Sequence, residues 1–125
     1  MLTPTERDYY LALRAAVGDR FTIFTKVRLA DVLEPADKAH HQSLFNRIKS
    51  KHVDFVLCDS ASFAPVLCIE LDDASHRRKD RQKRDAFLDA AMHHAAVGLL
   101  RVTARSRYDS LDVLHQVDTA ITQGS

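Results

Sequence analysis

"HVDFVLCDSASFAPVLCIELD", residues 52–72, holds two apolar runs separated by a polar segment that contains Ser, Asp and Pro. Runs of this length that are rich in Val, Phe, Leu and Ile and bounded by turn-forming residues are typical of β-strands. The stretch therefore predicts strands over 52–58 and 65–72, paired as an antiparallel hairpin. We expect Cys58 to lie opposite Val66, which fixes the register of the two strands.

The expected register brings Asp54 opposite Glu70, with their Cβ atoms about 5 Å apart. Like charges at this position destabilise a sheet, and ionised carboxylates are costly to bury without a partner. Two arrangements would remove the repulsion. A divalent cation can bind between the carboxylates, and oxygen-only ligands favour Mg²⁺ or Mn²⁺. Alternatively, each carboxylate pairs with a cationic side chain from a neighbouring strand, with Lys26 and Arg101 as the candidates.

Further helices and strands are predicted on both sides of this hairpin. Thr3, Pro4 and Glu6 have the spacing of a capping box, so a helix should begin there, and Gly18 should end it. The other expected elements are a strand over 21–28, a turn over 30–35, helices over 38–50 and 80–96, a strand over 99–104 and a helix over 109–122. The last helix is expected to bury Leu111, Leu114, Val117 and Ile121. This order predicts one three-layer α/β domain.

The composition is typical of a soluble globular chain, since 46% of the residues are hydrophobic and 28% are charged. No run approaches the roughly 20 apolar residues of a membrane span. The start, "MLTPTERDYY", lacks the basic-then-apolar pattern of a secretory signal, so we expect a cytoplasmic protein. The formal net charge of +1 is unevenly distributed, because residues 77–84, "RRKDRQKR", carry +5 and the rest of the chain carries −4.

Four motifs in order carry a resemblance to a known family: "VDF", "IELDDASH", a following helix rich in Asp and Arg, and "GLLRV". Together they resemble the PD-(D/E)XK nuclease superfamily, in particular the branch of the very-short-patch mismatch-repair endonuclease. More narrowly, "KVRLADVLEP", "KHVDFVLCD" and "IELDDASH" resemble the bacterial family known as domain of unknown function 2726. The resemblance covers residues 3–120. It implies a restriction-endonuclease-like fold with a mixed central sheet and αβββαβ core order, as a single nuclease-like domain over residues 1–125.

The resemblance also implies a metal site and catalytic roles. Asp54, Glu70 and the Leu71 carbonyl would bind Mg²⁺ or Mn²⁺. Glu6 matches an acidic position that often orients water in the superfamily, although its place in the capping box explains it equally well. Membership of the superfamily would make the chain a metal-dependent DNA endonuclease, acting in repair or defence.

One position departs from the superfamily pattern. The usual motif has Lys two residues after the second acid, and this chain has Asp72 there. Asp72 and His76 instead match the "E-x-D-x-x-x-H" pattern of the mismatch-repair branch. His76 is our predicted proton-transfer group, because an imidazole titrates near neutral pH. Lys26 is the runner-up, and Lys51 is the other lysine considered.

The basic run predicts the contact with the DNA backbone, because clustered Lys and Arg bind phosphates without reading sequence. Its basic residues are Arg77, Arg78, Lys79, Arg81, Lys83 and Arg84. The rival reading is a non-catalytic module that binds nucleic acid or protein and keeps only the fold. A homodimer formed through the C-terminal helix, and further domains or subunits that supply specificity, are also compatible with the sequence.

Overall fold

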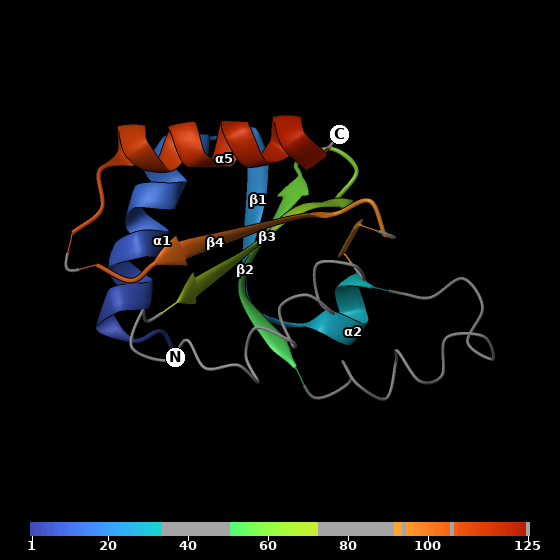
Figure 1. Ribbon diagram of the computed structural model, residues 1–125, viewed down its shortest axis with the longest axis horizontal. Helices are drawn as coiled ribbons and strands as arrows, with labels where there is room; N and C mark the ends of the chain where they lie inside the picture. The colour runs from blue at the N-terminus through green and yellow to red at the C-terminus, as the bar shows by residue number, and fades with distance from the viewer. Residues whose placement is uncertain (34–50, 73–91, 94, 106, 125) are drawn as a thin grey trace.

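The computed structural model describes residues 1–33, 51–72, 92–93, 95–105 and 107–124 (Figure 1). In these ranges the chain forms an α/β structure with one four-stranded sheet. The elements are α1 (Pro4–Val17), β1 (Phe21–Arg28), α2 (Leu29–Val32), β2 (His52–Asp59), β3 (Pro65–Asp72), β4 (Gly98–Thr103) and α5 (Ser110–Gly124). The expected helix over 38–50 and most of the one over 80–96 lie outside the described residues.

The sheet is mixed, with strand order β1-β2-β3-β4. β1 and β2, and β2 and β3, pair antiparallel, whereas β3 and β4 pair parallel. The predicted hairpin and the predicted mixed sheet are therefore confirmed. The parallel pair has a functional consequence: the C-terminal ends of β3 and β4 lie side by side, next to the N-terminal end of β2.

The hairpin register is confirmed over most of its length and wrong near the turn. Val56 pairs with Cys68, as expected, but Cys58 pairs with Pro65 rather than with Val66, because the register shifts between Leu57 and Cys58. The cause is the turn that follows. Asp59 accepts hydrogen bonds from the N–H groups of residues 61 and 62 at 2.8 and 2.9 Å, which closes the turn tightly, and Val66 is left as an extra residue of β3 between the paired positions 65 and 67.

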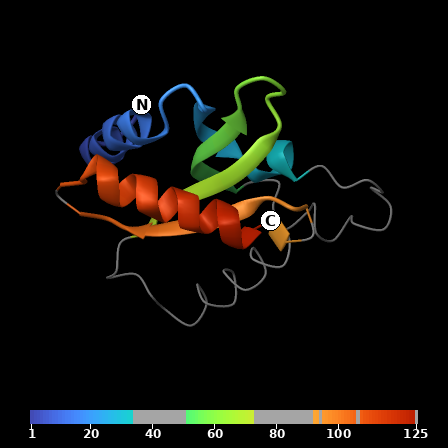
Figure 2. The same cartoon turned by 90° about the horizontal axis from the view of Figure 1, so that it is seen from above.

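Two apolar clusters lie on opposite faces of the sheet. The first joins α1 and α5 to residues of β2 and β3 such as Phe55, Leu57, Leu67 and Ile69, and the second joins α2 to Val56, Cys58 and Cys68. Both views show α2 lying away from α1 (Figures 1 and 2). Cys58 and Cys68 are buried free thiols, and burial raises the pKa of Cys68 to about 12. The described residues thus form an apolar cluster on each face of the sheet.

Three local predictions are wrong. The turn expected from residue 30 begins as the one-turn helix α2, and the helix expected to run to residue 96 has ended by Ala95, which is exposed. In α5, Leu111 is exposed, and Val113 is buried together with Val117. Residues 113 and 117 lie four apart on one helical face, whereas residue 111 is about 200° around the axis from residue 113. Among the described residues, no helix is long and apolar enough to cross a bilayer.

Candidate active site

Lys26 lies within β1, at a point where the backbone departs from the regular strand conformation. Its φ is +54°, a left-handed conformation that costs a non-glycine residue about 1–3 kcal/mol. The register places it opposite Asp54. In a regular strand Ile23 and Val27 would face the same side of the sheet. Here Ile23 packs against the cluster under α1 and Val27 against the cluster under α2, on the opposite face. This backbone conformation lets the Lys26 side chain leave the strand toward the first turn of α1.

The Lys26 ammonium bridges two carboxylates from two different elements. It forms a salt bridge with Glu6 Oε2, and its Nζ lies 3.7 Å from Asp54 Oδ1. The other oxygen of Glu6 accepts a hydrogen bond of 2.9 Å from the Thr3 N–H, and the Thr3 hydroxyl accepts one of 3.2 Å from the Glu6 N–H. The predicted capping box is therefore confirmed. Glu6 both starts the helix and holds Lys26.

Ionised Glu6 and protonated Lys26 stabilise each other. Burial disfavours the ionised form of Glu6, but the bonds from Lys26 and Thr3 outweigh it and hold the Glu6 pKa below its usual value. The hydrogen bond to Glu6 raises the pKa of Lys26, against a smaller opposing effect of burial. Lys26 is thus a cation at neutral pH, and about half of its side chain remains accessible to solvent.

Asp54 lies between Lys26 and the end of β3. Its Oδ2 accepts a hydrogen bond of 2.8 Å from the Leu71 N–H, and about a quarter of its side chain is exposed. Burial raises the pKa of Asp54, and the favourable effects of Leu71 and Lys26 do not fully offset it, partly because Glu6 is close. The negative charge of Asp54 is therefore incompletely compensated by the described residues. A cation would relieve that imbalance.

Glu70 and Asp72 are both buried at the end of β3. Glu70 lies one position beyond the Phe55–Ile69 pair, which places it opposite Asp54 as expected. Glu70 Oε2 is 3.7 Å from Nε of Arg101, its register partner on β4. The carbonyl of Asp72 accepts a hydrogen bond of 2.8 Å from the N–H of residue 104. Pairing of the site carboxylates with Lys26 and Arg101, one of the two predicted arrangements, is confirmed.

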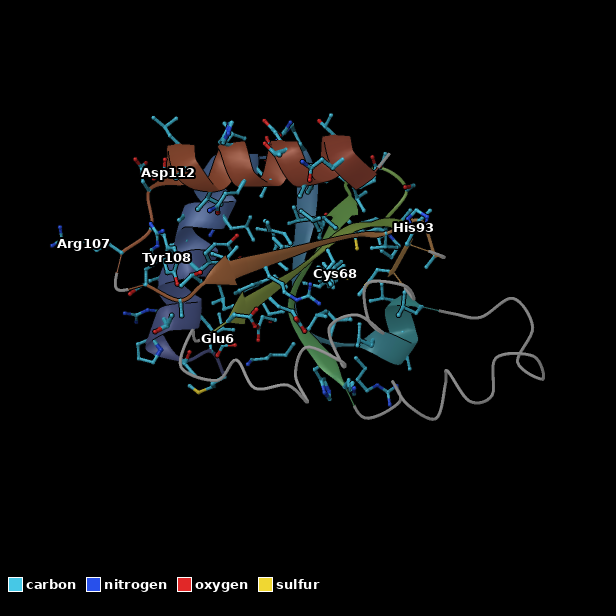
Figure 3. All side chains as sticks on the ribbon, in the orientation of Figure 1. Glu6, Cys68, His93, Arg107, Tyr108 and Asp112 are labelled. Carbon is cyan, nitrogen blue, oxygen red and sulfur yellow. The ribbon has the colours of Figure 1, made fainter. Side chains whose placement is uncertain are left out.

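The structure brings together most of the predicted catalytic and metal-binding residues. Glu6, Lys26, Asp54 and Leu71 form one contact network at the N-terminal end of α1, where Figure 3 shows Glu6, and Glu70 and Asp72 lie on the adjoining strand end. Lys51 lies just before β2, and its carbonyl accepts a hydrogen bond from the Leu29 N–H. The predicted residues His76, Arg77, Arg78, Lys79, Arg81, Lys83 and Arg84 lie outside the described residues.

The oxygen ligands at this strand end suit Mg²⁺. In the described part of the chain, no three His, Cys, Asp or Glu side chains gather as a metal cluster. Mg²⁺, however, binds through one or two carboxylates and keeps several waters. Asp54, with its under-compensated charge, Glu70 and the Leu71 carbonyl match that requirement. The predicted ligand set therefore fits the ion in chemistry, and binding itself stays a prediction.

Replacing Glu6 by glutamine should lower the free energy of unfolding by about 0.5–1 kcal/mol at neutral pH, because glutamine can cap the helix but cannot pair with Lys26. The folded-state pKa of Glu6 is lowered, so its stabilisation is present above the unfolded value and is lost as pH falls through the folded-state pKa. The difference between the variant and the wild type should accordingly shrink below pH 4.5. Urea unfolding at several pH values measures it, with Asp8→Asn as a control on the same helix. A pH-independent difference would contradict the ion pair.

A known protein sequence matches this chain, but no solved structure does. An uncharacterized protein of Haemophilus influenzae is 31% identical over 100 residues, which cover 78% of this chain and 50% of the relative. This chain thus matches about half of the length of that relative. The family model described as "Protein of unknown function (DUF2726)" matches residues 1–121, and the chain therefore belongs to that family, as its motifs predicted.

Proposed function

We propose that this chain is a metal-dependent endonuclease domain that hydrolyses phosphodiester bonds in DNA, with a restriction-endonuclease-like fold of the PD-(D/E)XK type. The observation that carries the proposal is the position of Lys26. Its ammonium lies 3.7 Å from Asp54, at the strand end where Glu70 and Leu71 also lie. A cation beside two acidic metal ligands is the arrangement that hydrolysis of a phosphodiester needs.

Lys26 supports the proposal because it supplies the positive charge that the superfamily motif places at the position occupied here by Asp72. The superfamily motif places its lysine two residues after the second acid, on the strand occupied here by β3. In this chain the lysine comes from β1, on the opposite side of β2, and reaches Asp54, the first acid of the pair. The left-handed backbone at residue 26 directs it there. The site therefore has a cationic side chain, Lys26, although the motif position itself has no lysine.

Each residue of the network has a task in the proposed reaction. Asp54, Glu70 and the Leu71 carbonyl would hold Mg²⁺, which supplies positive charge to the phosphate oxygens and favours ionisation of the attacking water. Lys26 remains protonated, because Glu6 raises its pKa, so it acts as a positive charge toward the phosphate and not as a base. Glu6 positions Lys26. Proton transfer by His76 stays a prediction, as does backbone binding by residues 77–84.

A second candidate is the non-catalytic module that binds nucleic acid or protein. The observation that favours it is the pairing of both acids with cations of the same chain: Asp54 with Lys26 and Glu70 with Arg101. Ion pairs of this kind can hold a strand end without any metal. The two candidates differ in one measurable property, the affinity of this pair of acids for a divalent cation.

Wild-type protein should bind Mg²⁺ or Mn²⁺ saturably and cut DNA only when one of them is present. Isothermal titration calorimetry measures the binding. A panel of nicked, mismatched, branched and single-stranded DNA, incubated with Mg²⁺ or with EDTA, measures the cleavage and its preferred substrate. Saturable metal binding with EDTA-sensitive cleavage supports the endonuclease. No heat of binding up to millimolar metal, together with intact DNA across the panel, would favour the module.

A further inference from the structure

Three arginines line a small cavity between the end of β4 and the first turns of α5. The cavity has a volume of about 140 Å³, and its walls include Arg101, Arg105, Arg107, Tyr108, Asp109 and Asp112. Sites for whole small molecules usually measure about 300–1,000 Å³. This one is too small for a nucleotide or a cofactor. It has room for a few water molecules, at about 30 Å³ each, or for a single tetrahedral anion.

The three arginines that line the cavity outnumber its two aspartates, Asp109 and Asp112. Asp109 Oδ1 accepts a hydrogen bond of 3.0 Å from the Leu111 N–H and so caps α5. Arg101 lies beside Glu70. Arg105 and Arg107 are exposed, and neither forms a salt bridge with any residue in the described ranges. Two arginines that line a cavity of this size suit a phosphate, because a guanidinium group can bind a phosphate through two parallel hydrogen bonds.

Tyr108 holds the segment that carries these arginines. Its hydroxyl accepts a hydrogen bond of 2.7 Å from the Arg105 N–H, and its ring meets the Tyr9 ring edge-on at 5.0 Å. Tyr9 is fully buried on α1, the helix that also carries Glu6. Figure 3 shows Tyr108 beside α1 and Arg107 projecting from the end of the molecule. The guanidinium groups thus extend from a segment whose backbone is anchored to the core.

The sheet places this segment beside the candidate active site. Arg101 is the register partner of Glu70, and the residue before Arg105 donates its N–H to the Asp72 carbonyl at 2.8 Å. We expect a DNA strand bound at Asp54 and Glu70 to continue past this segment, because the backbone of residue 104 is hydrogen-bonded to the end of β3.

We infer that Arg105 and Arg107 form a phosphate-binding site for the DNA backbone, next to the site of hydrolysis and separate in sequence from the basic run at 77–84. The inference rests on the proposed function, because the phosphate belongs to the DNA that the endonuclease cuts. The pair positions the strand, as backbone contacts do, and reads no sequence. It assigns a DNA contact to residues that sequence analysis did not select.

The test is the salt dependence of DNA binding, measured by fluorescence anisotropy with a short labelled duplex and the whole protein in EDTA. Each lost phosphate contact should lower the slope of log affinity against log salt by about 0.9. Because both arginines bind the same phosphate, the double variant Arg105→Gln/Arg107→Gln should show this loss of about 0.9 with affinity about tenfold weaker, and each single variant a smaller part of it. Replacing both by Lys should restore most of the slope. Arg20→Gln is the matched control, since this exposed arginine precedes β1 at the other end of the sheet.

The outcomes separate this inference from the proposed function. If the wild type binds DNA and the Arg105 and Arg107 variants change its slope no more than Arg20→Gln does, the inference is wrong and the endonuclease proposal stands. If the wild type shows no salt-dependent DNA binding, both fail. Titration with inorganic phosphate, followed by the NMR amide signal of Arg105, identifies the source of the anion. Saturation by phosphate that leaves DNA binding unchanged would make this a free-anion site and overturn the inference.

Discussion

Lys26→Met should reduce the rate of DNA cleavage by about 10²–10³-fold while leaving Mg²⁺ binding in place. Methionine keeps the unbranched aliphatic stem and removes the charge that lies 3.7 Å from Asp54. Loss of one preorganised group that stabilises developing negative charge has an effect of this size. Single-turnover cleavage at saturating Mg²⁺ measures it. Calorimetry on the same variant shows whether the metal site survives, and this separates a role toward phosphate from a role in assembling the ligands.

Stability must be controlled in this experiment, because Lys26 also neutralises Glu6, whose side chain is 8% exposed. We expect Lys26→Met to lower the free energy of unfolding by about 1–2 kcal/mol, the usual cost of a buried polar group without its partner. Lys26→Arg keeps the charge and should retain part of the activity. Lys26→Gly should be more stable than Lys26→Ala by about 1 kcal/mol, because glycine adopts a φ of +54° without strain. Full cleavage by a folded Lys26→Met protein would contradict the role of Lys26 toward the phosphate, and loss of cleavage in His76→Ala would support proton transfer by His76.

Hydrophobic patterning predicted most of the fold. The strands at 21–28, 52–58 and 65–72 and the first helix needed only alternation, turn residues and a capping box, and all are present within a residue or two. The failures have local causes. The bulge at Cys58 depends on how Asp59 closes its turn, and the exposure of Leu111 depends on how α5 rotates against the sheet. Both are set by tertiary contacts that a local pattern does not contain.

The sequence predicted the acidic residues of the candidate site and only some of its cationic residues. Asp54 and Glu70 lie on neighbouring antiparallel strands, so the predicted register of the hairpin was enough to place them opposite each other. Lys26 was one of several candidates, because in a regular strand its direction follows simple alternation. Its left-handed backbone breaks that alternation, and sequence signals such a conformation for Gly or Asn but not for Lys. Arg105 and Arg107 were not selected, since only the parallel pairing of β3 and β4 brings their segment to Asp72.

Asp54→Asn offers the most direct separation of metal binding from structure. The side-chain amide keeps one oxygen, which can still accept the hydrogen bond from the Leu71 N–H, so the substitution removes the charge and retains this contact. Burial raises the pKa of Asp54, so its ionisation opposes folding above the folded-state pKa, and this penalty disappears as pH falls below the unfolded value. Without metal, Asp54→Asn should therefore be at least as stable as the wild type at neutral pH.

The same substitution should lower cleavage by about 10³-fold or more and remove the response to metal. In the wild type, Mg²⁺ at 100 times its dissociation constant should add about 2.7 kcal/mol to the free energy of unfolding, because the ion binds only the folded chain. In Asp54→Asn the melting temperature should be the same with Mg²⁺ and with EDTA. Thermal unfolding under both conditions, with Asp59→Asn as the matched control at the other end of β2, measures the difference. A variant that melts well below the wild type in EDTA would identify Asp54 as the structural partner of Lys26, because only a carboxylate needed for folding would be missed when no metal is present.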